Sequence, residues 1–223
     1  MISHGIKLII SLSILGLFPF NSSVIASNNF NTDPKKNLNT VSTIVIDAGH
    51  GGKDSGCLAG GIKEKNITLA ISKRVHQLMK EAFPSLKIIM TREDDRFLPL
   101  QVRADIANHH QANVFVSIHC NSISTNRIHG TETYVMGLHT AEENLEVVKR
   151  ENASLLLEGK DPNDIEGLIM MQMNQNVHLD QSLILADKIE RYFAYETPLR
   201  SRGVKQAGFF VLRQTAMPSV LIE

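Results

Sequence analysis

The sequence predicts an α/β fold, in which a mostly parallel central sheet of about six strands has helices on both faces and carries a helical insertion. Three observations predict it. Apolar, β-branched runs alternate with segments of helical periodicity. The runs are continuously apolar, which is typical of a sheet covered on both faces. The order strand, helix, strand, helix, strand requires right-handed crossovers between parallel strands.

The elements can be placed from these patterns. Helical spacing begins at Asn66 and ends before Pro84, begins again at Leu100, and returns over Leu183–Phe193. The expected strands are residues 43–47, 86–91, 113–119, 130–136, 209–213 and 219–223.

The first residues have the pattern of a signal peptide. Lys7 precedes an apolar stretch, Leu8–Phe20, that is short for a membrane span, and Val24-Ile25-Ala26 fits a small-x-small cleavage site. We therefore expect residues 1–26 to be a signal peptide, 27–41 a polar linker and 42–223 the folded domain. The protein would then be exported, periplasmic or secreted, with no membrane span after cleavage. An uncleaved membrane anchor is the alternative.

Residues 140–180 are polar, acidic and rich in methionine, with helical patches at 142–158 and 165–178. This segment is far longer than a compact connection needs, so we expect an insertion with helices of its own. Its Met170, Met171 and Met173 belong either to a plastic core or to a binding face.

The overall composition excludes some classes of partner. The net charge is +0 with a pI near 7.1, which gives no indication of a nucleic-acid or polyanion surface. Cys57 and Cys120 are the only thiols. An exported compartment permits a disulfide between them, but two buried, unpaired residues fit the sequence equally well.

Three side chains carry the candidate chemistry. His50 follows the first strand, Glu64 directly precedes the first helix, and His119 ends the third strand. Loops after parallel strands share one edge of the sheet, so these groups can converge. Two imidazoles and a carboxylate form a common catalytic zinc set, which leaves one position for water. Glu223, which ends an apolar strand, is the candidate general base.

Other polar residues are less specific. Asp47 either orients His50 from behind or is only the polar end of its strand. We expect His76, His109 and His110 to be structural or exposed, while the sequence leaves His129 and His178 open.

Four motifs then occur in order: I-V-I-D-A-G-H-G-G, G-I-K-E-K-N-I-T-L, F-V-S-I-H-C-N and M-P-S-V-L-I-E. Together they resemble the zinc-dependent N-acetylmuramoyl-L-alanine amidases of the amidase_3 family, from Thr43 to Glu223. The resemblance implies zinc on His50, Glu64 and His119, with Glu223 as the catalytic glutamate. It also implies peptidoglycan as the substrate, cleaved between N-acetylmuramic acid and L-alanine in wall remodelling or cell separation. The alternatives are another zinc peptidase of the stem peptide and a non-catalytic wall-binding module.

The chain departs from the family pattern in three places. Cys120 replaces the usual alanine, Ala48 replaces a proline, and the sequence stops at Glu223 where relatives continue, so we expect a truncated C-terminus. The insertion resembles one in division-associated amidases, where a helix covers the zinc until a protein activator displaces it. The blocking carboxylate would come from one of four residues, and a surface excursion without regulatory role is the alternative. The four are Glu146, Glu151, Glu158 and Glu166.

Overall fold

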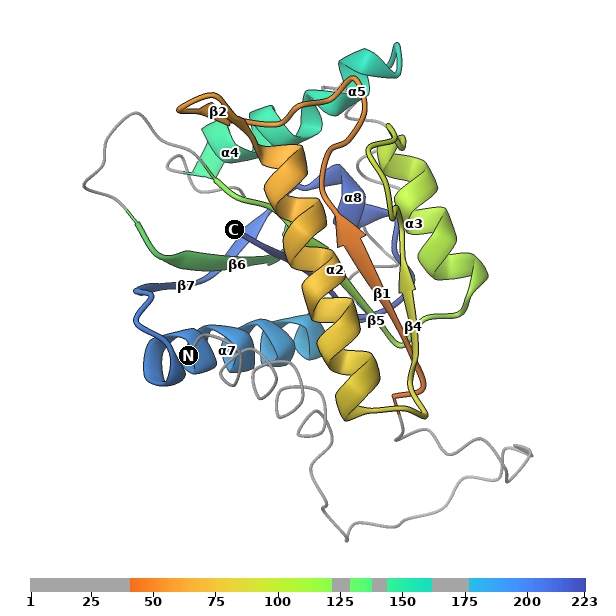
Figure 1. Cartoon of the computed structure of the whole chain (residues 1–223), viewed down its shortest axis with the longest axis vertical. Helices are drawn as coiled ribbons and strands as arrows, with labels where there is room; N and C mark the ends of the chain where they lie inside the picture. Colours follow the sequence, from red (N-terminus) through yellow and green to blue (C-terminus); the bar gives the residue numbers. More distant parts are fainter. Residues whose placement is uncertain (1–40, 122–128, 138–143, 162–176) are drawn as a thin grey trace, which may run out of the picture.

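The computed structural model describes residues 41–121, 129–137, 144–161 and 177–223. Its centre is a six-stranded sheet with the order β4-β1-β5-β8-β6-β7 (Figure 1). The strands are β1 Thr43–Ala48, β4 Lys87–Met90, β5 Val114–Ile118, β6 Thr131–Met136, β7 Ser201–Ala207 and β8 Ser219–Ile222. A separate hairpin pairs β2 Leu58–Ala59 with β3 Ile62–Lys63. All pairs in the large sheet are parallel except β6 with β8.

Helices cover both faces of this sheet, which confirms the predicted fold class. One apolar cluster joins the sheet to α2 and α7, and the other joins it to α3, α4, α5 and α8. The helices are α2 Glu64–Ala82, α3 Leu100–His109, α4 Leu145–Asn152, α5 Ser154–Leu157, α7 Leu179–Glu196 and α8 Phe210–Arg213.

Burial on both sides explains the continuous apolar runs. In β1, Ile44 and Ile46 pack on the side of α2 and α7, whereas Val45 packs on the side of α3 and α8. Successive strand residues point to opposite faces, so a strand covered twice needs an apolar residue at every position.

The fifth predicted strand is wrong. Residues 209–213 contain the short helix α8, in which Val211 and Leu212 are buried. A five-residue apolar run cannot be assigned by periodicity alone, because a buried helical turn looks the same. The fifth strand of the sheet in chain order is instead β7, whose sequence S-R-G-V-K-Q-A is polar. It lies at the sheet edge, where charged residues are common, so it lacks the apolar signal of a central strand.

The remaining differences concern boundaries. α2 begins at Glu64 rather than Asn66, and α7 extends four residues N-terminal of the predicted start at Leu183. The first helical patch of the insertion is confirmed as α4 and α5. The signal peptide, nearly all of the linker and most of the second patch lie outside the described residues. Within the described part of the chain, no helix is both long and apolar enough to span a membrane.

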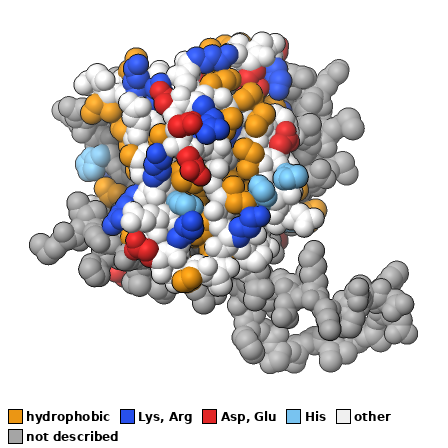
Figure 2. Space-filling view, turned by 45° about the vertical axis from the view of Figure 1, so that its right-hand side comes forward, with side chains coloured by type: hydrophobic (Ala, Val, Ile, Leu, Met, Phe, Trp, Pro, Cys, Tyr) orange, Lys and Arg blue, Asp and Glu red, His pale blue; other side chains and the backbone are white. Residues whose placement is uncertain are grey.

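The surface carries both signs of charge. Lysine and arginine side chains are interspersed with aspartate and glutamate over the face shown in Figure 2. That face of the described residues therefore lacks the single-sign patch expected of a polyanion-binding surface.

Candidate metal centre

The ends of β1 and β5 bring two histidines together. These strands are parallel neighbours with Ala48 opposite Ile118, and His50 and His119 follow them by two residues and one residue. Their imidazole centroids lie 4.7 Å apart. Gly49 makes this approach possible, because a Cβ at its position would lie 2.5 Å from His119 Nε2.

Two buried arginines fix the backbone around His50. His50 has a φ of 60°, which is uncommon for a residue other than glycine. Arg103 donates to the carbonyls of Ala48 and His50, at 2.8 and 2.7 Å, and Arg92 donates to that of Gly49 at 2.7 Å. The three carbonyls of the turn are thereby satisfied without water, and this compensates for the unfavourable dihedral angle.

Asp47 acts on this turn through Arg103. Its carboxylate accepts hydrogen bonds from Arg103 Nη1 at 2.8 Å, Thr91 Oγ1 at 2.6 Å and Ser117 Oγ at 2.7 Å. Burial alone would raise the pKa of Asp47, but Arg103 and the two hydroxyls hold it below its usual range. The group that meets His50 directly is Asp54, whose Oδ2 lies 3.0 Å from Nδ1. Asp54 was not among the residues predicted from the sequence, although a carboxylate four residues after a histidine in a Gly-rich loop is a usable signal.

Glu64 enters the site from the first residue of α2. Its Oε1 lies 3.2 Å from His50 Nε2 and 3.4 Å from His119 Nδ1. Its two oxygens also accept hydrogen bonds from the backbone N–H groups of Cys57 and Cys120, at 2.8 and 2.9 Å. The carboxylate is therefore held from both sides while it faces the imidazoles.

A fourth donor comes from α4. Glu151 Oε2 lies 3.2 Å from His50 Nε2 and 2.9 Å from His119 Nδ1. Of the three candidates of the insertion that lie in the described residues, Glu151 is the one that reaches the imidazoles. Glu146 is exposed, Glu158 instead accepts a hydrogen bond from Leu100 N at 2.7 Å, and Glu166 lies outside the described residues.

These four residues fit a divalent metal. One donor atom from each of His50, Glu64, His119 and Glu151 lies within 4.8 Å of the other three, and all four side chains are buried. His50 Nε2 and His119 Nδ1 make no well-aligned hydrogen bond although the carboxylates are close. Two imidazoles and two carboxylates around one point match the nitrogen and oxygen ligands that zinc accepts.

The protonation states follow from this crowding. Burial opposes the charged form of both imidazoles, but Asp54, Glu151 and Glu64 raise the pKa of His50 to about 12. Glu151 and Glu64 raise that of His119 to about 10. The imidazoles in turn lower the pKa of both glutamates, despite their burial. Without a metal, the cluster therefore balances two imidazolium groups against its carboxylates, and a divalent cation can replace the two protons.

Glu223 lies next to this cluster, but its pKa is shifted upward, whereas those of Glu64 and Glu151 are shifted downward. Both carboxylate oxygens are buried without a hydrogen-bond partner. Burial and the negative charge of Glu151 raise its pKa well above the usual value. The main chain holds it on both sides: His119 N donates to Ile222 O at 2.9 Å, and Glu223 N donates to Glu132 O at 2.9 Å.

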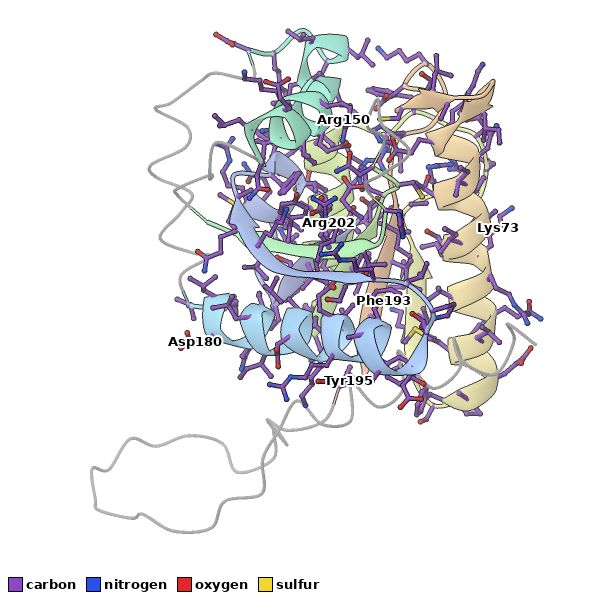
Figure 3. The ribbon with its side chains drawn as sticks, turned by 90° about the vertical axis from the view of Figure 1, so that its left-hand side faces the viewer. Lys73, Arg150, Asp180, Phe193, Tyr195 and Arg202 are labelled. Atoms are coloured by element: carbon purple, nitrogen blue, oxygen red, sulfur yellow. The ribbon has the colours of Figure 1, made fainter. Side chains whose placement is uncertain are left out.

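Glu132 was not singled out by the sequence analysis. It is buried and pairs with Lys205 at 2.7 Å and with Arg202 at 3.2 Å, both on the edge strand β7. Figure 3 views this edge, with Arg202 on β7 and Arg150 on α4. Glu132 lies on β6, so its two ion pairs connect β7 to the strand that pairs with β8 and Glu223.

None of the other histidines among the described residues belongs to the cluster. His109 and His129 are exposed, and His76, His110 and His178 are half-buried. The expectation for His76, His109 and His110 is confirmed. The two cysteines are half-buried and carry free thiols.

Comparisons with known proteins all lead to one family. The sequence profile of the family Amidase_3, "N-acetylmuramoyl-L-alanine amidase", matches residues 44–223. The chain is 31% identical over 207 residues to N-acetylmuramoyl-L-alanine amidase AmiA of Escherichia coli, covering 90% of this chain and 71% of AmiA. Among solved structures, the N-acetylmuramoyl-L-alanine amidase of Clostridium difficile 630 is 26% identical with a TM-score of 0.59, covering 82% of this chain and 78% of that one. The catalytic domain of CwlV from Bacillus (Paenibacillus) polymyxa var. colistinus is 31% identical with a TM-score of 0.53, covering 82% and 79%.

Proposed function

The chain belongs to the N-acetylmuramoyl-L-alanine amidase family and is a peptidoglycan amidase, and from this premise we propose that it is an exported, zinc-dependent enzyme held inactive by its own helix α4. The observation that carries the proposal is the buried cluster of His50, His119, Glu64 and Glu151. The first three residues would hold the metal permanently, and Glu151 would leave.

The division of roles follows from how each group is held. His50 and His119 hang from the ends of β1 and β5, and Glu64 is fixed by two backbone N–H groups. A zinc ion held there supplies Lewis acidity, polarising the amide carbonyl and lowering the pKa of water to about 7. Asp54 on His50 Nδ1 would fix the tautomer that leaves Nε2 for the metal.

Glu223 is proposed as the general base. It would take a proton from the attacking water and return it to the nitrogen of the departing L-alanine. Its carboxylate has no competing partner among the described residues, so it is available for this transfer. With α4 in place, burial and the neighbouring negative charge of Glu151 together favour the protonated form of Glu223, which cannot accept a proton. Displacement of α4 would remove that charge and admit water, so it would open the metal and favour the basic form of Glu223 together.

Hydrogen bonds at both ends of α4 and beyond it attach the described part of the segment that carries Glu151. At the start of α4, Asn144 Oδ1 accepts a hydrogen bond from Lys205 at 3.1 Å. At its end, Asn152 bonds Gly208 O and Phe210 N, at 3.0 and 2.9 Å. Beyond it, Lys53 donates to Leu157 O at 2.6 Å. Individual hydrogen bonds of this kind each contribute about 1 kcal/mol, so a binding partner can outweigh them.

The apolar residues that α4 and α5 bury indicate what kind of surface that partner must have. Val147 of α4 and Leu155 of α5 are buried in the core cluster on this face. Lifting the helices exposes both, so we propose a protein activator that displaces the 140–180 insertion and covers this apolar surface.

Export and biological role complete the proposal. Residues 1–26 would direct the chain out of the cytoplasm, 27–41 would link it to the catalytic domain 42–223, and the mature protein would be periplasmic or secreted. Its reaction separates stem peptides from glycan strands, which suits wall remodelling or the separation of daughter cells.

The proposal is tested with purified protein and isolated peptidoglycan. We expect about one equivalent of zinc, in keeping with a single donor cluster. At the low basal rate that remains while α4 covers the site, mass spectrometry should detect released stem peptides with intact N-terminal L-alanine. His50→Ala should lose zinc and activity, and Glu223→Gln should keep zinc but lose activity. His109→Ala and Glu146→Gln, which change exposed residues of the same types, are the matched controls. Retained muropeptide release by His50→Ala, or absence of zinc without chelator, would refute the zinc mechanism.

A further inference from the structure

The only two cysteines of the chain lie on opposite sides of one carboxylate. The backbone N–H of Cys57 donates to Glu64 Oε2 and that of Cys120 donates to Glu64 Oε1, at 2.8 and 2.9 Å. Cys57 lies in the loop after β1, whereas Cys120 follows β5 by two residues. Residues 63 positions apart in sequence therefore meet at Glu64.

Close packing holds the Cys57 segment against this carboxylate, because a Cβ on the preceding residue, Gly56, would lie 2.6 Å from Glu64 Oε2. Neither sulfur belongs to the donor cluster found among the described residues. The thiols can therefore react without removing a metal ligand.

We propose that Cys57 and Cys120 form a disulfide under oxidising conditions, and that this cross-link clamps the two backbone segments that hold Glu64. Disulfide-bonded cysteines have Cα atoms about 4.4–6.8 Å apart, and the backbone nitrogens of Cys57 and Cys120 lie 2.8 and 2.9 Å from the two oxygens of the same carboxylate. The cross-link would connect the loop of His50 and Glu64 covalently to the end of the strand that leads to His119.

The chemistry is thiol–disulfide exchange with a low-molecular-weight disulfide. One cysteine thiolate attacks the oxidant, forms a mixed disulfide and releases one small thiol. The second cysteine thiolate then attacks the protein sulfur of that mixed disulfide and releases the other small thiol. The protein loses two electrons and two protons, and the oxidant is reduced to two thiols.

The disulfide should slow the release of the metal ion. Glu64 keeps its orientation only while both N–H donors stay in place, so opening of either loop weakens a ligand. A cross-link between the two loops suppresses that opening. Zinc should consequently leave the oxidised protein several-fold more slowly than the reduced protein.

The experiment begins with the reduced, zinc-loaded full chain, incubated with oxidised glutathione. We expect the intact mass to fall by two hydrogen atoms, a peptide pair joined through Cys57 and Cys120 after proteolysis, and slower transfer of zinc to a chromogenic chelator. Cys57→Ser and Cys120→Ser should each form only a mixed disulfide and show no change in zinc release beyond that caused by glutathione itself.

Two results would overturn the inference. Both thiols remaining open to alkylation after oxidation, or each carrying its own glutathione, would exclude the cross-link. A cross-linked protein that loses zinc at the rate of the reduced protein would exclude the clamp. The mass measurement requires neither zinc nor activity, so its failure would leave the proposed zinc mechanism standing.

Discussion

Replacing Asn152 by alanine should raise the amidase activity of the chain in the absence of any activator. Asn152 uses both ends of its amide to attach the C-terminal end of α4, donating to Gly208 O at 3.0 Å and accepting from Phe210 N at 2.9 Å. It touches none of the four metal-site donors. Its removal should therefore weaken the attachment of Glu151 without changing the chemistry.

The size of the effect can be worked from these two bonds. Each contributes about 0.5–1.5 kcal/mol net, so alanine should favour displacement of α4 by about 1–3 kcal/mol. That range corresponds to an increase of about 5- to 150-fold in the ratio of open to closed molecules. While the closed form predominates, basal activity should rise by the same factor.

The assay is release of dye from labelled peptidoglycan by zinc-saturated protein, with thermal melting to check the fold. Lys149→Ala is the matched control, since this residue lies on the same helix, is exposed and pairs only with Glu146 among the contacts described. An Asn152→Ala protein that melts normally, binds zinc and has wild-type basal activity would refute the blocking role of α4. A rise in the Lys149→Ala control would refute the assignment to Asn152.

Three further predictions follow from the same site. Glu151→Gln should raise basal activity, measured by dye release, because a neutral amide competes less well for the metal; unchanged activity would contradict the block. Zinc at about 1,000 times its Kd should stabilise the protein by about 4 kcal/mol relative to protein whose metal has been removed by a chelator. Zinc should therefore raise the melting temperature of the wild-type protein but not that of His50→Ala. Asp47→Asn should destabilise the fold at neutral pH by about 3–5 kcal/mol, because it leaves the buried guanidinium of Arg103 without its carboxylate counter-charge. Since the folded pKa of Asp47 is depressed, its contribution is present above the unfolded pKa of about 3.9 and is lost as pH falls through the folded value. Wild-type unfolding free energy should therefore decline below about pH 4 more steeply than that of Asp47→Asn, in denaturant titrations across that range.

The parts of the fold that the sequence predicts are those with a strong local pattern. β1 and β5 are buried on both faces, and each is followed by its histidine, so both the strands and the edge they share could be inferred. β7 could not, because an edge strand is stabilised by main-chain pairing and is free to be polar. α8 was misassigned because four residues give no period to measure.

The same contrast applies to the site. His50, Glu64 and His119 stand next to the ends of regular elements, so topology alone brings them together. The position of Glu151 depends on how α4 packs next to the carboxyl ends of β1 and β5, where the two histidines lie. That packing is a tertiary contact and has no local signature in the sequence. The roles of Arg92 and Arg103 were likewise hidden, because their partners are backbone carbonyls some 40 to 55 residues away in sequence.

Main-chain pairing on both sides of Glu223 has a consequence for how this enzyme can vary. His119 and Glu223 sit at the ends of adjacent strands, so their separation is set by the spacing of a β-sheet, about 4.8 Å between neighbouring strands, and not by any loop. The segment between β6, which ends at Met136, and α7, which begins at Leu179, contributes no strand to the sheet in its described part. It can lengthen, shorten or change its partner without moving either group. The proposed catalytic geometry and its proposed control are thus encoded in separate stretches of chain, and one can change while the other is preserved.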